Sequence, residues 1–180
     1  MGAFTYPRSE PGSGGHQDLV ERLITNAAAL RAELAGLPEA TLSHRPGDGE
    51  WSIKEIIGHL RDHAEFLHRR LHMISKLEEP LLEAYDEQAL VRERNPQAAP
   101  IDELLAGFST QRNATIEMLG ELVHWNWARC GRHVEFGRMS VRQFVDRTLA
   151  HDDAHLAQIR SLKQAAPSRV SSNFELRASN

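Results

Sequence analysis

Two histidines lie four residues apart near the C-terminal end of the chain, in the stretch HDDAHLAQI, residues 151–159. On a helix, residues i and i+4 share one face, so His151 and His155 can direct two imidazoles at one point. Three protein nitrogens with an open fourth position are typical of catalytic zinc sites. The spacing is short and common, and two polar residues on the flank of a bundle are the simpler interpretation. Zinc proteases carry a glutamate where this chain has Asp152, which argues against that class.

An earlier segment, WSIKEIIGHLRDHAEFLHRRLH, offers candidates for a third ligand. It contains His59, His63, His68 and His72. At about 100° per residue around a helix, the first two lie on one flank of the apolar stripe and the last two on the other. Helix geometry therefore narrows the third ligand to His59 or His63, with a slight preference for His63.

Four amphipathic segments predict the helices that hold these histidines. Apolar residues recur at steps of three and four over residues 16–34, 53–74, 101–119 and 141–162, which is the spacing of one helix face. Ser52 with Glu55, and Ser140 with Gln143, predict capping boxes at the second and fourth helices. The alternation at Val134–Phe136 is too brief to found a sheet. These patterns predict an all-α four-helix bundle.

Long connections separate the last three predicted helices. Residues 81–100 are interpreted as a connection with a short helical turn at Leu81–Leu90, and residues 124–139 form the second. The predicted organisation is a flexible N-terminal arm over 1–15, the bundle domain over 16–164 and a polar C-terminal tail over 165–180.

Composition excludes several classes of function. The 180 residues carry a net charge of −4, which gives no basic surface for nucleic acid. The single cysteine, Cys130, allows no intrachain disulfide and indicates a reducing, cytoplasmic compartment. No apolar run is long enough to span a bilayer, so we expect no membrane partner.

The two histidine segments resemble the motifs of the DinB-like superfamily, also called the DinB/YfiT-type metalloproteins. That family opens its second helix with a tryptophan and then a histidine followed by an apolar residue, here Trp51 and His59-Leu60. It ends with a histidine pair spaced by three residues, here His151 and His155. The resemblance covers roughly residues 16–164.

The resemblance implies a four-helix bundle with long crossover connections and a divalent metal, zinc or nickel, bound by His59, His151 and His155. It thereby replaces His63, the choice favoured by helix geometry, with His59. It implies a metal-dependent enzyme of the thiol S-transferase type, with a low-molecular-weight thiol as cosubstrate, and a homodimer. The alternatives are a metal-dependent hydrolase and a non-enzymatic stress-related bundle with a structural or vestigial metal site.

Further residues are expected near this site. Asp152 and Asp62 are candidates to accept the free N–H of a metal-bound histidine, and His63 is a fourth ligand, a proton shuttle or an exposed residue. Trp51 is expected to pack beside the site. Arg112 resembles a recurrent arginine of the family and is expected to bind an anionic group or to form a surface salt bridge. His133 is interpreted as a turn residue, with the pocket wall as the alternative.

Overall fold

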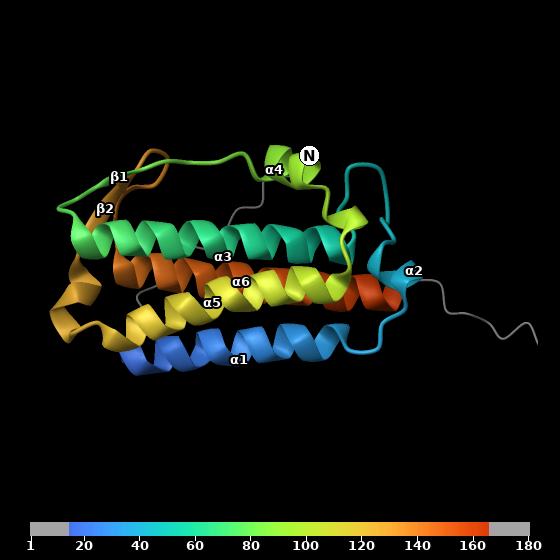
Figure 1. Ribbon diagram of the computed structural model, residues 1–180, viewed down its shortest axis with the longest axis horizontal. Helices are drawn as coiled ribbons and strands as arrows, with labels where there is room; N and C mark the ends of the chain where they lie inside the picture. The colour runs from blue at the N-terminus through green and yellow to red at the C-terminus, as the bar shows by residue number, and fades with distance from the viewer. Residues whose placement is uncertain (1–14, 166–180) are drawn as a thin grey trace, which may run out of the picture.

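The structure is a computed structural model that describes residues 15–165, and within them four long helices form a bundle (Figure 1). These helices are α1 (His16–Leu34), α3 (Ile53–Lys76), α5 (Ile101–Glu121) and α6 (Val141–Ala165). They confirm the predicted all-α bundle and lie within a few residues of the predicted segments. The predicted arm, residues 1–15, and tail, residues 165–180, lie outside the described residues except at Gly15 and Ala165.

The order of the helices around the bundle is not their order in the chain. Helix α3 packs against α5 and α6, and α1 packs against the same two helices. In Figure 1, α3 and α5 begin at the same end of the bundle and therefore run parallel. The chain between them must return along the length of the bundle, which is the predicted long crossover. None of the helices within residues 15–165 is long and apolar enough to cross a membrane.

Reciprocal capping begins the two helices that carry the histidine motifs. The Ser52 hydroxyl accepts from the Glu55 backbone N–H at 3.3 Å, and the Glu55 carboxylate accepts from the Ser52 N–H at 2.9 Å. The same pair of bonds joins Ser140 and Gln143, at 3.2 and 2.8 Å. Both predicted capping boxes are confirmed, and each satisfies backbone donors that a helix start otherwise leaves without partners.

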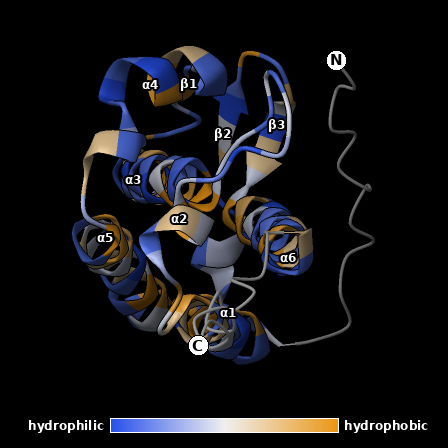
Figure 2. Ribbon diagram, turned by 90° about the vertical axis from the view of Figure 1, so that its right-hand side faces the viewer, coloured by the Kyte–Doolittle hydropathy of each residue, from blue (hydrophilic) through white to orange (hydrophobic). Residues whose placement is uncertain are grey.

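The core consists of two groups of buried apolar side chains that meet along α3. One group surrounds Ile53, Ile57 and Leu60, and the other surrounds Leu67 and Ile74. Figure 2 shows the hydrophobic sides of α3 and α6 turned toward the interior of the bundle. Each such side chain contributes about 1.5–3 kcal/mol to folding, so this stripe fixes which flank of α3 faces α6.

The connection after α3 differs from its predicted form. It contains β1 (Leu81–Leu82), α4 (Glu87–Arg94) and a 3₁₀ turn η1 (Pro96–Ala98), so the helical turn predicted at Leu81–Leu90 is wrong in position. Asp86 begins α4, because its carboxylate accepts from the Ala89 backbone N–H at 2.9 Å. Short helices α2 (Glu39–Leu42) and η2 (His124–Ala128) complete the helical elements of the described chain.

A small sheet corrects the prediction that no strands form. Strand β2 (Cys130–His133) pairs in parallel with β1 and antiparallel with β3 (Gly137–Ser140). Residues 134–136, the alternation seen in the sequence, form the turn between β2 and β3, and Gly137 after them has φ 71°. The strands have two to four residues and lack β-branched side chains, so their pairing depends on contacts between distant segments.

Candidate metal centre

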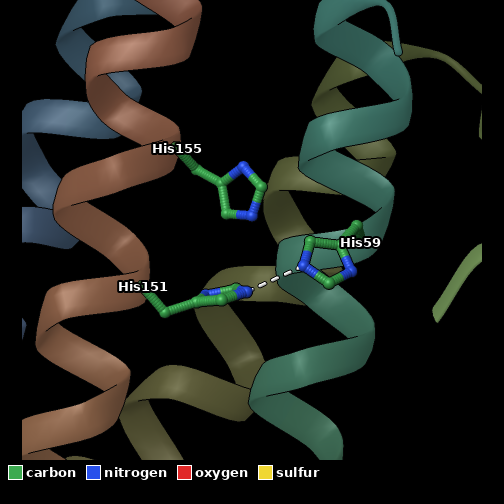
Figure 3. Close-up of side chains that lie close together, drawn as sticks. All are labelled: His59, His151 and His155. Atoms are coloured by element: carbon green, nitrogen blue, oxygen red, sulfur yellow. Dashed lines mark hydrogen bonds between the residues drawn. The ribbon is translucent and has the colours of Figure 1, made fainter. Parts of the chain in front are cut away.

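Three histidine side chains converge in the bundle interior, one from α3 and two from α6 (Figure 3). His59, His151 and His155 are 1%, 2% and 7% exposed, and one ligand nitrogen from each lies within 4.8 Å of the other two. The Nε2 atoms of His59 and His151 are 2.8 Å apart. Two nitrogens bound to one tetrahedral zinc lie roughly 3.3 Å apart, so small ring rotations suffice to bring all three nitrogens to one ion.

The three imidazoles are in the protonation state that metal binding requires. Burial lowers the pKa of His59 and His151 well below the ordinary value, and repulsion between neighbouring histidines lowers each further. Burial also lowers the pKa of His155, and the hydrogen bond that its N–H donates to Gln158 raises that pKa in opposition. Neutral rings offer lone pairs, so the donor set fits a borderline divalent ion such as zinc or nickel.

Neighbouring side chains fix the orientation of two of these rings. The Gln158 Oε1 atom lies 2.9 Å from His155 Nδ1 and accepts its N–H when the ring is neutral, which leaves the Nε2 lone pair for a metal. Trp51 packs beside the cluster, with its ring centre 5.0 Å from that of His59 and 6.5 Å from that of His155. The structure therefore places Trp51 at the position expected from the sequence.

Asp152 and Arg112 form a buried ion pair beside the cluster. Arg112 Nη2 lies 2.9 Å from one Asp152 carboxylate oxygen and 3.0 Å from the other. Burial raises the pKa of Asp152, and the Arg112 guanidinium opposes that shift. Of the two roles predicted for Arg112, a surface salt bridge is wrong, because the residue is only 1% exposed. Asp152 Oδ1 is 3.9 Å from His151 Nδ1, which is close enough for electrostatic influence but not for a direct hydrogen bond.

Asp62 forms ion pairs with two arginines and does not belong to the histidine cluster. Its Oδ1 accepts from Arg61 at 2.8 Å and from Arg94 of α4 at 2.7 Å. Three residues after His59 on α3, Asp62 faces the crossover connection. The structure therefore does not bring Asp62 into contact with a candidate ligand.

His63 lies one turn beyond His59, against the cluster. Its ring stacks on His151 with centres 4.1 Å apart, while the centres of His63 and His59 are 6.4 Å apart. Its Nδ1 atom is buried, so the interpretation as an exposed residue is wrong. His63 is not in the group of nitrogens that lie within 4.8 Å of one another, whereas His59 is. The arrangement favours His59 as the third ligand.

A recess opens next to the cluster and shares His151 with it. His63, Arg70, Glu87, His133 and Arg147 are among the side chains that line it. His133 ends β2 and is 3% exposed, so its interpretation as a turn residue is wrong. Among the charged lining residues, only Arg147, one turn before His151 on α6, could have been placed here from its spacing in the sequence. The others come from α3, α4 and the turn after β2, which no short-range pattern brings together.

The sequence of the chain is similar to those of known proteins. The family model described as the DinB superfamily matches residues 22–159. The uncharacterized protein YuaE of Bacillus subtilis (strain 168) is 26% identical over 155 residues, which are 78% of this chain and 96% of that protein.

Solved structures share the fold. YfiT from Bacillus subtilis, described as having an unusual four-helix bundle topology, superimposes with a TM-score of 0.80 at 19% identity, over 88% of this chain and 91% of that one. The four-helix bundle protein TT2238 gives 0.63 at 20% identity, over 82% of this chain and 99% of that one. A protein from Streptococcus pneumoniae gives 0.68 at 12% identity, over 85% and 92%.

Proposed function

The chain belongs to the DinB superfamily, and from this premise we propose that it is a metal-dependent enzyme whose single divalent ion is bound by His59, His151 and His155. The observation that carries the proposal is the convergence of three buried imidazoles whose ligand nitrogens lie within 4.8 Å of one another. Zinc and nickel are the proposed ions, since both accept three imidazole ligands.

The residues of the chain prepare the site for catalysis. A divalent ion held by three nitrogens supplies a Lewis acid that lowers the pKa of a bound water or thiol. The buried surroundings keep the histidines neutral, and the Gln158 contact holds His155 with Nε2 directed at the cluster. The Arg112–Asp152 pair places a carboxylate 3.9 Å from His151. Three protein ligands leave a position for substrate, and the recess lies beside it.

We propose a thiol S-transferase reaction, in which a small-molecule thiol loses its proton at this site and its sulfur bonds to a carbon of a second substrate. The bond from that carbon to its leaving group breaks, and the leaving group departs with the electron pair and takes up a proton. The resemblance of the histidine motifs supports this class of reaction. Hydrolysis is the second candidate, because YfiT is described as a probable metal-dependent hydrolase. A thiol-dependent loss of substrate supports transfer, whereas product formation from water without added thiol supports hydrolysis.

A purely structural metal site is the non-enzymatic alternative. Such sites are closed, with four protein ligands. The described residues bring three ligand nitrogens together, and the fourth nearby histidine, His63, stacks on His151 instead of joining them. This difference supports a catalytic role.

Metal analysis of purified variants tests the proposal. His59→Ala, His151→Ala and His155→Ala should each reduce bound metal sharply in folded protein, measured by elemental mass spectrometry. His72→Ala, which removes an exposed histidine of the same α3 helix, is the matched control and should retain the metal. If His63→Ala removes the metal while His59→Ala retains it, the ligand assignment on α3 is wrong. A screen for thiol transfer and for hydrolysis with the metal-loaded protein follows.

A further inference from the structure

The recess beside the histidine cluster is built like a binding site for a small polar molecule. Its walls come from α3, α6, the start of α4 and the turn after β2, which the long crossover brings together. His151, a candidate metal ligand, forms part of one wall.

His133, one of the residues that line the recess, has a buried hydrogen-bond donor. The backbone N–H of Glu135 donates to His133 Nδ1 at 3.2 Å, so this nitrogen carries no proton. In a neutral imidazole the proton then resides on Nε2, and burial lowers the pKa of His133, which keeps the ring neutral. Nε2 is buried and has no hydrogen-bond partner among the described residues. A buried donor without an acceptor destabilises the fold, so its presence calls for an acceptor from outside the chain.

Both signs of charge line the same recess. Arg70 and Arg147 supply guanidinium groups, and Glu87 and Glu135 supply carboxylates. The Arg147 guanidinium lies 3.9 Å from the centre of the ring of Phe136, another lining residue. A ligand with a single charge would meet groups of its own sign in this lining. A ligand with a positive and a negative group can be attracted at both ends.

Burial makes these charges more effective. Arg70 and Glu87 are both half-buried, and this burial lowers the pKa of Arg70 and raises that of Glu87. Electrostatic interactions strengthen where water is reduced. The lining charges are therefore suited to select a ligand by the placement of its own charges.

We propose that the recess binds the zwitterionic α-amino acid end of the substrate, with its carboxylate at His133 Nε2 and Arg147, its ammonium group at Glu87, and its reactive atom beside His151. The proposal rests on the proposed function for the reactive end of the substrate. In this proposal His133 determines substrate specificity by direct contact with the substrate, and it is not one of the metal ligands.

Three small thiols provide the test on metal-loaded protein. L-cysteine carries both charged groups, cysteamine lacks the carboxylate and 3-mercaptopropionate lacks the ammonium group. Calorimetric titration should show L-cysteine binding roughly tenfold or more tightly than either truncated thiol, because charged hydrogen bonds are lost in both. Equal affinities for the three thiols would overturn the proposal.

Variants of the recess locate the effect. His133→Phe should remove the advantage of L-cysteine over cysteamine while leaving the affinity for cysteamine unchanged, and His133→Gln, which keeps an N–H donor, should restore part of it. Arg147→Met is a second variant with the same expected direction. His72→Phe is the control, since His72 is exposed and does not line the recess. An unchanged preference in His133→Phe and Arg147→Met would mean that His133 holds a water only, which refutes the proposal.

Metal-free protein separates this inference from the proposed function. L-serine and ethanolamine differ by the same carboxylate and need no metal, and saturation-transfer NMR reports their binding. The protein could bind no metal and still prefer L-serine over ethanolamine, with the preference lost in His133→Phe. The enzyme proposal would then be refuted, and the proposal that the recess binds an amino acid group would be supported. If metal binds and thiols react with no preference for the amino acid group, the recess proposal fails and the enzyme stands.

Discussion

Outside the histidine cluster, Arg112 is the residue whose replacement should reduce the free energy of unfolding most. Its guanidinium is buried against Asp152 and lies 5.1 Å from the centre of the Phe108 ring. Arg112→Leu leaves a buried carboxylate without its partner, which costs about 3–5 kcal/mol. We expect urea denaturation to show a loss of that size.

The exposed pair between Arg160 and Glu33 provides the control for this measurement. Arg160 is half-exposed, and its Nε donates to the Glu33 carboxylate at 2.7 Å. Arg160→Leu should change the free energy of unfolding far less than Arg112→Leu does, because exposed pairs contribute little. Equal losses in the two variants would show that the Arg112 pair is not insulated from water.

The buried histidines predict how stability depends on pH in metal-free protein. The pKa values of His59, His63 and His151 in the fold lie well below 6.5, the value in the unfolded chain. Below pH 6.5 the unfolded state therefore binds more protons, and the free energy of unfolding falls as pH is lowered. Each histidine steepens the slope by up to about 1.4 kcal/mol per pH unit.

Urea midpoints measured between pH 8 and pH 5 test this expectation. They should be flat above pH 7 and fall below 6.5. His63→Gln should reduce the slope, whereas His72→Gln, at an exposed position, should not. A midpoint that rises on acidification would contradict the burial of neutral rings.

At the residue scale, the sequence predicted the location of the candidate site but not all of its wall. Spacing on helices was enough to bring His151 and His155 together and to limit the partner to His59 or His63. For His133 the preferred interpretation, a turn residue, was wrong and the alternative, the pocket wall, was right, because its burial depends on a strand of four residues that pairs with distant segments. Short-range patterns contain no information on such contacts.

Helix α3 approaches the crossover connection closely at one glycine. A Cβ atom at Gly58 would lie 2.3 Å from the Pro96 side chain, which is nearer than atoms can pack. Gly58→Ala should therefore destabilise the protein by about 1–3 kcal/mol. Gly120→Ala, on α5 with open space around the added Cβ, should instead be neutral or stabilising by up to about 1 kcal/mol. Thermal unfolding of both variants checks the contrast, and a harmless Gly58→Ala would refute the close packing of η1 on α3.

At the scale of elements, the long helices were predictable and the connections were not. The signals that define a helix, its apolar stripe and its capping residues, depend on neighbours only a few residues away. Sequence alone therefore predicted the positions of four helices, two of which begin at the capping residues Ser52 and Ser140. The strands, α4 and η1 form because the crossover is held along the bundle. Gly58 and Gly131, which permit this packing, appear in the sequence as ordinary residues of a helix and a loop.

At the scale of the whole molecule, we propose that the protein forms a homodimer, as the family resemblance implies. Large apolar side chains remain exposed on the described surface, among them Trp125 at 72% and Leu81 at 66%. A second copy could cover such side chains. Multi-angle light scattering should give twice the 20.3 kDa chain mass. A mass equal to one chain would refute the dimer and leave the metal centre unaffected.

The distance of 92 positions along the chain from His59 to His151 has a consequence for folding kinetics. The proposed ion cannot bridge α3 and α6 until the crossover from α3 to α5 and the connection from α5 to α6 have both formed (Figure 1), so its ligands assemble late. Metal should then slow unfolding and leave the refolding rate almost unchanged, because stabilising contacts absent from the transition state act on the unfolding rate. In stopped-flow experiments, only the unfolding arm of the chevron plot should move when the ion is added.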